Sequence, residues 1–305
     1  MGRPGVRLRP LNRGIVYAAL AFAWWGLFPL YFRIVTTVPP GEILAHRIVW
    51  SLVFLLGVLA LRRQWAWMTP VLRQPKVLAA FSVSSMLLAG NWLTYLWAVN
   101  NGHVIDSSLG YFINPLVNVL LGYTLLHERP RRVQWIALSL AGLGVMWLTF
   151  AAGTLPWIAL VLAASFGAYG LMRKVAALGP LEGLALETIL LTPLALLALA
   201  WWAWQGRGVF PAPDATTNLW LIAFGPITAV PLLLFAAGAR RLPLTTLGLL
   251  QYIGPTLQFV LGVWIFHEPF TASRGLGFGC IWLALLLYSA DGWRSARQAA
   301  VVAPA

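Results

Sequence analysis

The feature that most constrains this chain is a series of long apolar runs separated by short polar connections. A helix needs about 20 mainly apolar residues to cross the hydrocarbon core of a bilayer. Ten segments meet that requirement, and they are residues 14–34, 42–61, 77–99, 105–126, 133–151, 156–175, 181–204, 217–239, 243–266 and 273–291. The connections are too short to hold a soluble domain. The sequence therefore predicts an all-α integral membrane protein with ten transmembrane helices.

The composition agrees with a surface covered by lipid. Hydrophobic residues make up 60% of the chain and charged residues only 10%, whereas soluble domains contain about 25% charged residues. The net charge of +13 does not indicate a nucleic-acid partner. A nucleic-acid-binding protein gathers its Lys and Arg on one soluble face, but here they fall in small groups between the apolar runs.

The positions of the basic residues predict how the spans are oriented. Lys and Arg near the ends of spans favour the cytoplasmic side of a membrane. With the N-terminus placed inside, 17 of the 21 basic residues fall on the cytoplasmic side, only Arg33, Arg207 and Arg274 fall on the other side, and Arg47 lies within a span. We therefore expect both termini to be cytoplasmic and the number of spans to be even.

Motifs for enzymatic or metal chemistry are missing from the sequence. The pairs His127-Glu128 and His267-Glu268 resemble the start of a zinc-protease HExxH motif, but Arg131 and Thr271 stand where the second histidine is required. The single cysteine, Cys280, cannot form an intramolecular disulfide. No Walker A motif or dinucleotide-binding glycine pattern occurs. The sequence predicts neither an enzyme nor a bound cofactor or metal.

The two halves of the chain repeat one another at an offset of 140 residues. The stretch INPLVNVLLGYTLLHE from Ile113 aligns with IGPTLQFVLGVWIFHE from Ile253. Five spans is an odd number, so the second copy must be inverted relative to the first. The expected units are residues 14–152 and 153–293, between the cytoplasmic tails 1–13 and 294–305. Inverted repeats around a site at the membrane midplane are a recurring architecture of secondary transporters.

Polar side chains follow one face of two equivalent spans. Ser107, Tyr111, Asn114 and Asn118 recur at helical spacing in the fourth span, and Gln251 and Gln258 occupy the ninth. Asn91 lies in the third span. Polar groups within a bilayer normally face a cavity or one another. We expect these residues to line a substrate cavity, and the alternative is that they only join helices through hydrogen bonds.

Charged residues within the spans are scarce and are candidates for function. Glu42, His46 and Arg47 lie in the second span, with Glu42 and His46 spaced i, i+4. Arg47 either extends toward the membrane surface or faces the cavity, where it would hold an anionic group or order Glu42. Glu187 in the seventh span is the repeat equivalent of Arg47. It is the candidate for proton coupling, with a local hydrogen-bonded role as the alternative, and its depth indicates a site separate from Arg47.

Glu128 and Glu268 invite a structural explanation. Each is followed by a proline, Pro130 or Pro269, and an apolar span. An acidic residue suits a helix N-terminus and a proline suits its first turn. We expect each glutamate to open the helix that follows it in the chain.

Four stretches of the sequence carry a family resemblance, and they are EILAHRIVW at 42–50, NWLTYLWAVNN at 91–101, SLGYFINPLVNVLLG at 108–122 and LGLLQYIGPTL at 247–257. With these stretches the chain resembles the RarD subgroup of the EamA family, within the drug/metabolite transporter superfamily. The resemblance covers residues 14–293 and implies two inverted five-helix units. It also implies that spans 1–4 and 6–9 surround a central cavity while spans 5 and 10 pack behind.

These observations predict a secondary transporter of the bacterial cytoplasmic membrane. It would carry a small organic solute by alternating access, as an exporter rather than an importer, with a proton or another ion as the coupling candidate. A membrane partner or assembly subunit that transports nothing is one alternative, and a lipid flippase is another. A measurement of flux through proteoliposomes would distinguish a transporter from a partner or assembly subunit. Lateral openings toward the lipid would favour the flippase.

Overall fold

The computed structural model describes residues 10–32, 38–101, 104–152, 157–265 and 272–302, and all regular secondary structure within these ranges is helical. The helices are α1 (Pro10–Gly26), α2 (Phe28–Phe32), α3 (Pro40–Arg62), α4 (Met68–Leu72), α5 (Pro75–Asn100), α6 (Val104–Leu125), α7 (Arg132–Ala152), α8 (Trp157–Val175), α9 (Pro180–Trp204), α10 (Ala215–Ala239), α11 (Leu244–Gln251), α12 (Ile253–Trp264) and α13 (Ala272–Val302).

Seven helical segments in the described ranges are long and apolar enough to cross a membrane. They are Arg13–Tyr31, Pro40–Arg62, Pro75–Ala98, Arg132–Phe150, Trp157–Val175, Pro180–Trp204 and Ala215–Ala239. Helices α6, the pair α11 and α12, and α13 occupy the other three predicted spans. The all-α class predicted from the apolar runs is confirmed, and the helix order follows the predicted order of spans.

The ninth predicted span, residues 243–266, is not one continuous helix. It consists of α11 and α12, which meet at Tyr252. Pro255 has no backbone N–H to donate to the carbonyl of Gln251, and its ring crowds that carbonyl. The ladder of hydrogen bonds is interrupted there, and the chain turns before it continues. Pro115, at the equivalent place in the first half, lies inside the uninterrupted helix α6.

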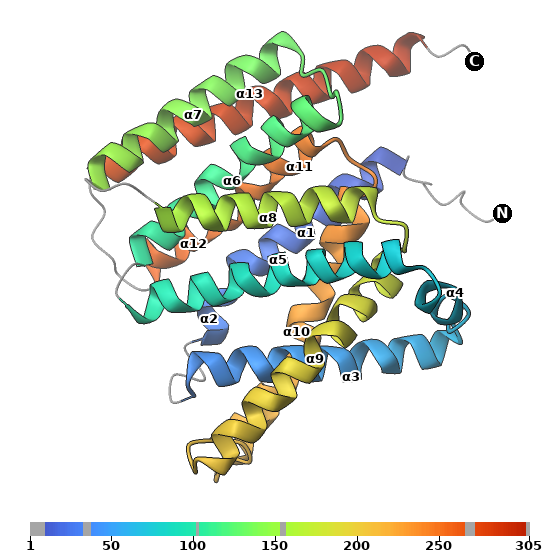
Figure 1. Cartoon of the computed structure of the whole chain (residues 1–305). Coiled ribbons are helices and arrows are strands. Elements are labelled where there is room, and N and C mark those ends of the chain that lie inside the picture. The colour runs from blue at the N-terminus through green and yellow to red at the C-terminus, as the bar shows by residue number, and fades with distance from the viewer. Residues whose placement is uncertain (1–9, 33–37, 102–103, 153–156, 266–271, 303–305) are drawn as a thin grey trace, which may run out of the picture.

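The helices pack side by side as one bundle (Figure 1). Helices α7 and α13 pair along one edge, and α9 and α10 both pack on α3 at the opposite edge. Between these edges, α6 packs on α8 and α1 packs on α10 and α12. The start of α1 and the end of α13 lie at the same end of the bundle.

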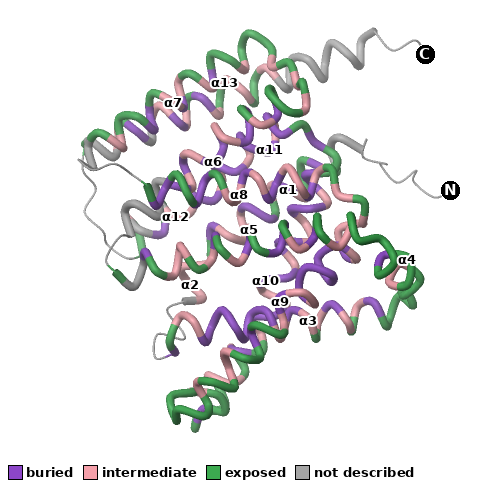
Figure 2. Tube along the Cα trace, viewed as in Figure 1, coloured by how far each residue is buried: buried purple, intermediate pink, exposed green. Residues whose placement is uncertain are grey.

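Burial is concentrated where α3 meets α9 and α10 (Figure 2). Seven consecutive residues of α3, from Glu42 to Ile48, are buried. The outer sides of α7 and α13 are exposed, and large apolar residues on these helices such as Phe150 and Leu286 are 81% and 67% exposed. A soluble protein rarely exposes so much contiguous apolar surface, so this outer face is suited to contact with lipid.

Candidate functional site

A small internal cavity lies between α3, α5, α9 and α10. Its volume is about 20 Å³, which is room for about one water molecule. Apolar side chains make up much of its wall, but Arg47 and Glu187 also line it, together with Thr228. The two charged side chains that the sequence assigned to separate sites therefore border the same space, from helices far apart in the chain.

Arg47 is a buried cation held by a hydroxyl and two aromatic rings. The residue is only 7% exposed. Its Nε donates a hydrogen bond of 2.9 Å to Thr228 Oγ1. Its guanidinium carbon lies 4.6 Å from the ring centre of Trp92 and 5.6 Å from that of Phe28. An arginine over an aromatic face is attracted by the ring quadrupole, so these contacts fix the guanidinium away from the membrane surface.

Tyr111 and Tyr95 pack on one another within electrostatic range of this cation. Their ring centres are 6.0 Å apart, and both phenol groups are close enough to interact electrostatically with Arg47. Tyr111 is half-buried. Among the residues of the predicted polar stripe in the fourth span, Tyr111 is therefore the one placed near Arg47. The side chain of Ser107 lies outside the described residues.

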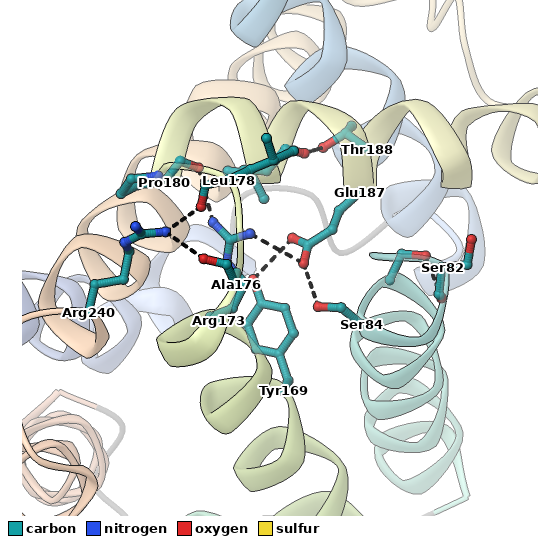
Figure 3. Close-up of polar contacts among 12 residues, drawn as sticks. Ser82, Ser84, Tyr169, Arg173, Ala176, Leu178, Pro180, Glu187, Thr188 and Arg240 are labelled. Atoms are coloured by element: carbon teal, nitrogen blue, oxygen red, sulfur yellow. Dashed lines mark hydrogen bonds and ion pairs between the residues drawn. The ribbon is translucent and has the colours of Figure 1, made fainter. Parts of the chain in front are cut away.

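Glu187 sits in a buried polar cluster that joins three helices (Figure 3). Ser84 of α5 donates a hydrogen bond of 2.5 Å to Glu187 Oε1, and the Tyr169 hydroxyl of α8 donates to Oε2 at 3.4 Å. Arg173, also on α8, places its Nη1 at 3.6 Å from Oε1. A carboxylate removed from water needs such partners, and the cluster supplies three of them.

Sequence reasoning missed Arg173 as part of this site. The residue was counted with Lys174 among the cytoplasmic loop charges, but it lies inside α8 and is 1% exposed. Its Nη2 donates to the Pro180 carbonyl at 3.1 Å. A spacing signal existed, because Tyr169 and Arg173 are four residues apart and so share one helix face. This spacing alone does not indicate a buried cation, because the acidic partner of Arg173 is Glu187, which comes from α9.

Glu42 and His46 form a second cluster at the far end of α3. Glu42 Oε1 accepts hydrogen bonds from the backbone N–H groups of Val209 and Phe210, at 2.8 and 3.1 Å. His46 Nε2 lies 3.8 Å from the same oxygen, and His46 Nδ1 accepts from Trp50 Nε1 at 3.2 Å. These contacts hold the connection between α9 and α10 against α3. Arg47 points to other partners.

The predicted amide-bearing residues join helices to one another. Asn114 Nδ2 donates to the Ala163 carbonyl at 2.8 Å. Asn118 Nδ2 donates to Asn114 Oδ1 at 3.0 Å and to Gln251 Oε1 at 3.1 Å. These bonds connect α6 with α8 and α11. Neither asparagine lines the small cavity.

Two further predicted residues make similar contacts elsewhere. Asn91 Nδ2 on α5 donates to the Leu162 carbonyl and to Ser165 Oγ on α8, both at 2.9 Å. Gln258 Nε2 on α12 donates to the Trp25 carbonyl at 3.3 Å, beside the end of α1. Each amide side chain thus forms a hydrogen bond from its own helix to a neighbouring helix, and the polar stripes lie along these helix contacts.

The structure corrects the expected role of Glu128. Its carboxylate accepts from the backbone N–H groups of Leu244 and Thr245, at 2.8 and 3.1 Å, and from Thr245 Oγ1 at 3.1 Å. Lys174 Nζ lies 3.8 Å away. Glu128 therefore caps α11, which is distant in sequence, and not α7, whose first turn contains no acidic residue. The equivalent residue Glu268 lies outside the described residues.

Among the described residues, no group of three or more His, Cys, Asp and Glu side chains is close enough to hold a metal ion. What the buried polar groups offer is charge and hydrogen bonding, the means by which a site recognises a solute.

Comparisons with known proteins identify one family. The profile of the EamA-like transporter family matches residues 12–150 and again residues 155–290. The uncharacterized transporter PA0485 of Pseudomonas aeruginosa is 46% identical over 291 residues, covering 94% of this chain and 97% of the relative. The protein RarD of Escherichia coli is 43% identical over 287 residues, covering 94% and 97%.

More distant similarities agree. The chloramphenicol-sensitive protein RarD of Pseudomonas aeruginosa is 32% identical over 300 residues, covering 95% of this chain and 97% of the relative. A crystal structure of a protein superimposes with a TM-score of 0.71 at 18% identity, covering 92% of this chain and 98% of that chain. That likeness concerns the fold alone. The chain belongs to the EamA-like transporter family, as one of its RarD-type members.

Proposed function

We propose that this protein is a secondary transporter that exports a small organic solute across the bacterial inner membrane by alternating access. The observation that carries the proposal is the cavity bordered by Arg47 and Glu187. Its walls come from α3 and α5 in the first half of the chain and from α9 and α10 in the second. A charged cavity between two halves is where a solute could be bound and then released on either side.

The helix contacts support two inverted five-helix repeats, residues 14–152 and 153–293, with ten spans in all. In the proposed repeat α3 corresponds to α9, and α5 corresponds to α10. The contact of α3 with α10 then corresponds to the contact of α9 with α5, and both contacts occur. In the same way α5 packs on α8 as α10 packs on α1, and α6 packs on α8 as α11 and α12 pack on α1. The two separate matches of the family profile also support two units.

The polar residues between the halves would line the path during transport. The hydrogen bond from Asn118 to Gln251 crosses from α6 to α11. We infer that Asn91, Tyr111, Asn114, Asn118, Gln251 and Gln258 become accessible to solute when these helices separate, with Glu42 and His46 holding the end of α3. Interhelical bonds of this kind are weak, about 0.6 kcal/mol each, so they permit such a separation.

The proposed orientation places both termini in the cytoplasm. Gln64, after α3, and Gln205, after α9, are both exposed and lie in connections at opposite ends of the bundle. In a Cys280→Ala background, Gln64→Cys in intact cells should resist a membrane-impermeant thiol reagent. Gln205→Cys should react with it. The reverse labelling pattern would invert the orientation.

The transport proposal is tested by flux through proteoliposomes. Vesicles containing the purified protein would be loaded with amino acids, organic acids or chloramphenicol, because one relative is named for sensitivity to that compound. We expect saturable efflux of at least one solute under a pH gradient. A protein inert toward every solute, yet monodisperse and correctly oriented, would favour a role as an assembly subunit.

Glu187 is our candidate for proton coupling. It is buried beside the cavity. Its carboxylate can bind a proton when its ion pair with Arg173 is broken. Because Glu187→Gln alone would leave Arg173 as an unpaired buried charge, the test uses the double variant Arg173→Met with Glu187→Gln, which should keep solute binding but lose the dependence of flux on the pH gradient. Full pH-dependent flux in this variant would remove Glu187 from the mechanism.

A lipid flippase is a second candidate because of a lateral groove. The groove has a volume of about 450 Å³ and lies on the outer face of α5 and α8, lined by Ser82, Thr94 and Ser165 among apolar side chains. Polar groups on a lipid-facing surface could guide a headgroup. Headgroup-dependent movement of fluorescent lipids between leaflets, with no solute flux, would favour this function.

A further inference from the structure

Arg47 carries a positive charge that no described residue neutralises. No carboxylate in the described ranges lies within ion-pair distance of it, and its only hydrogen bond there uses Nε. The two Nη groups have no acceptor among those residues. A buried cation in a membrane protein normally pairs with an opposite charge or with backbone carbonyls. Since the Nη groups of Arg47 have neither among the described residues, an anion from outside the chain would complement them.

Glu187 cannot serve as that partner in this conformation. It borders the same cavity, but its oxygens are engaged by Ser84, Tyr169 and Arg173. The charges of Glu187 and Arg173 cancel each other. The formal charge that remains at the cavity is therefore the single positive charge of Arg47, which complements a single negative charge.

The geometry of Arg47 selects a planar anion. The bond to Thr228 and the ring of Trp92 fix the plane of the guanidinium. Its Nη edge remains for a ligand, and a carboxylate matches that edge with two parallel hydrogen bonds. A phosphate dianion would bring a second negative charge with no cation to meet it.

The surroundings indicate the rest of the solute. The rings of Phe28 and Trp92 lie against the guanidinium, and Tyr95 and Tyr111 are within electrostatic range of it. The other cavity walls are largely apolar. A free ammonium group would find no unpaired carboxylate among the described residues at this cavity. The site therefore suits an acid whose body is apolar and otherwise uncharged, and it disfavours a zwitterion.

We propose that Arg47 binds the carboxylate of a small monocarboxylic acid with an apolar or aromatic body. This inference rests on the proposed transport function, because a cavity of about 20 Å³ admits such a solute only when the halves move apart. It names the chemical class of the solute and the residue that recognises its charge.

The test measures binding to the full-length protein in detergent by calorimetry. The probes are phenylacetate, its uncharged amide phenylacetamide, and the zwitterion phenylalanine. We expect phenylacetate to bind about tenfold or more tighter than either, as the loss of charge-assisted hydrogen bonds predicts. Equal affinity for the acid and the amide, tighter binding of phenylalanine, or no binding of phenylacetate would overturn the proposal.

Variants assign the effect to Arg47. Arg47→Gln should weaken phenylacetate about tenfold or more and leave phenylacetamide unchanged, and Arg47→Lys should lie between, because it keeps the charge but not the fork. Arg241→Gln is the matched control, since Arg241 also lies over a ring, that of Tyr17, but is exposed. If Arg47→Gln elutes as an aggregate, Thr228→Val provides the second test, with weakened phenylacetate binding expected and unchanged binding contradicting the proposal.

Flux distinguishes failure of this site from failure of the transport function. Tight phenylacetate binding that depends on Arg47, without any flux in proteoliposomes, would support the site and contradict the transporter. Saturable flux of other solutes with no preference for acids would support the transporter and overturn the site.

Discussion

The guanidinium of Arg173 lies 3.6 Å from the carboxylate of Glu187, and both side chains are only 1% exposed. The pair joins α8 to α9 next to the cavity between the two halves. Removing two charges from water costs several kcal/mol for each ion, and their attraction restores this only while both are present. The arrangement is therefore sensitive to the loss of either partner.

The Glu187→Gln variant should be strongly destabilised. Arg173 would keep its charge in a buried site without a carboxylate, a change that costs about 3–5 kcal/mol. The double variant Arg173→Met with Glu187→Gln should recover much of that loss, because no buried charge remains. Unfolding in detergent, followed by tryptophan fluorescence, measures both effects.

A more exposed ion pair provides the control. Arg131 and Asp291 lie 2.8 Å apart, but their side chains are 45% and 15% exposed. Solvent screening reduces such a pair to about 1 kcal/mol or less, so Asp291→Asn should have a small effect. A Glu187→Gln variant no less stable than Asp291→Asn would show that Arg173 does not depend on this carboxylate.

Ser84 should contribute more than a typical membrane hydroxyl. Its Oγ donates to the Glu187 carboxylate from α5, and hydrogen bonds to charged groups contribute about 1.5–3 kcal/mol. Ser84→Ala should lower unfolding stability by that amount. Thr94→Ala on the same helix removes only a local bond to the Gly90 carbonyl and should be nearly neutral. Equal losses in the two variants would contradict a special role for Ser84.

Gly248 allows α11 to approach α6 closely. A Cβ atom built at this residue would lie 2.8 Å from the Pro115 carbonyl oxygen and 3.1 Å from Asn118 Cβ. Gly248→Ala should therefore push the helices apart and cost about 1–3 kcal/mol. It should also weaken the bond between Asn118 and Gln251.

Gly57 is the matched control for this substitution. A Cβ at Gly57, in the C-terminal part of α3, meets nothing within 4 Å. Gly57→Ala should stabilise the protein by about 0.5–1 kcal/mol, because alanine loses less backbone entropy in a helix. Thermal unfolding of the two variants should shift in opposite directions. A loss of stability in Gly57→Ala would mean that close helix contact does not explain the effect at Gly248.

Much of the fold could be predicted because a bilayer restricts which backbone structures can cross it. Apolar runs of about 20 residues must be helices if they cross a membrane, and their positions match the helices observed. The break at Tyr252 could not be predicted in the same way. Pro115, the equivalent of Pro255, lies in a helix without such a break, so tertiary packing decides which proline interrupts its helix.

The candidate site was only partly predictable. Arg47 and Glu187 are conspicuous because charges within spans are rare, and both prove to be buried. Arg173 is not conspicuous, since it stands beside Lys174 near the end of a span, where basic residues usually mark the cytoplasmic side. Its partner comes from the next helix. Only the packing of α8 on the elements around it distinguishes a buried cation from a loop cation.

Glu128 offers a test that separates the structural assignment from the expectation based on sequence. As the cap of α11, its carboxylate holds the backbone N–H groups of Leu244 and Thr245. Glu128→Ala should therefore speed hydrogen exchange over residues 244–248 and leave residues 132–136 unchanged. Removing a cap costs about 1 kcal/mol, which corresponds to exchange about five times faster where opening is local. Faster exchange confined to 132–136 would mean that Glu128 serves α7, the next helix in the chain, and that the contact between α6 and α11 does not depend on this carboxylate.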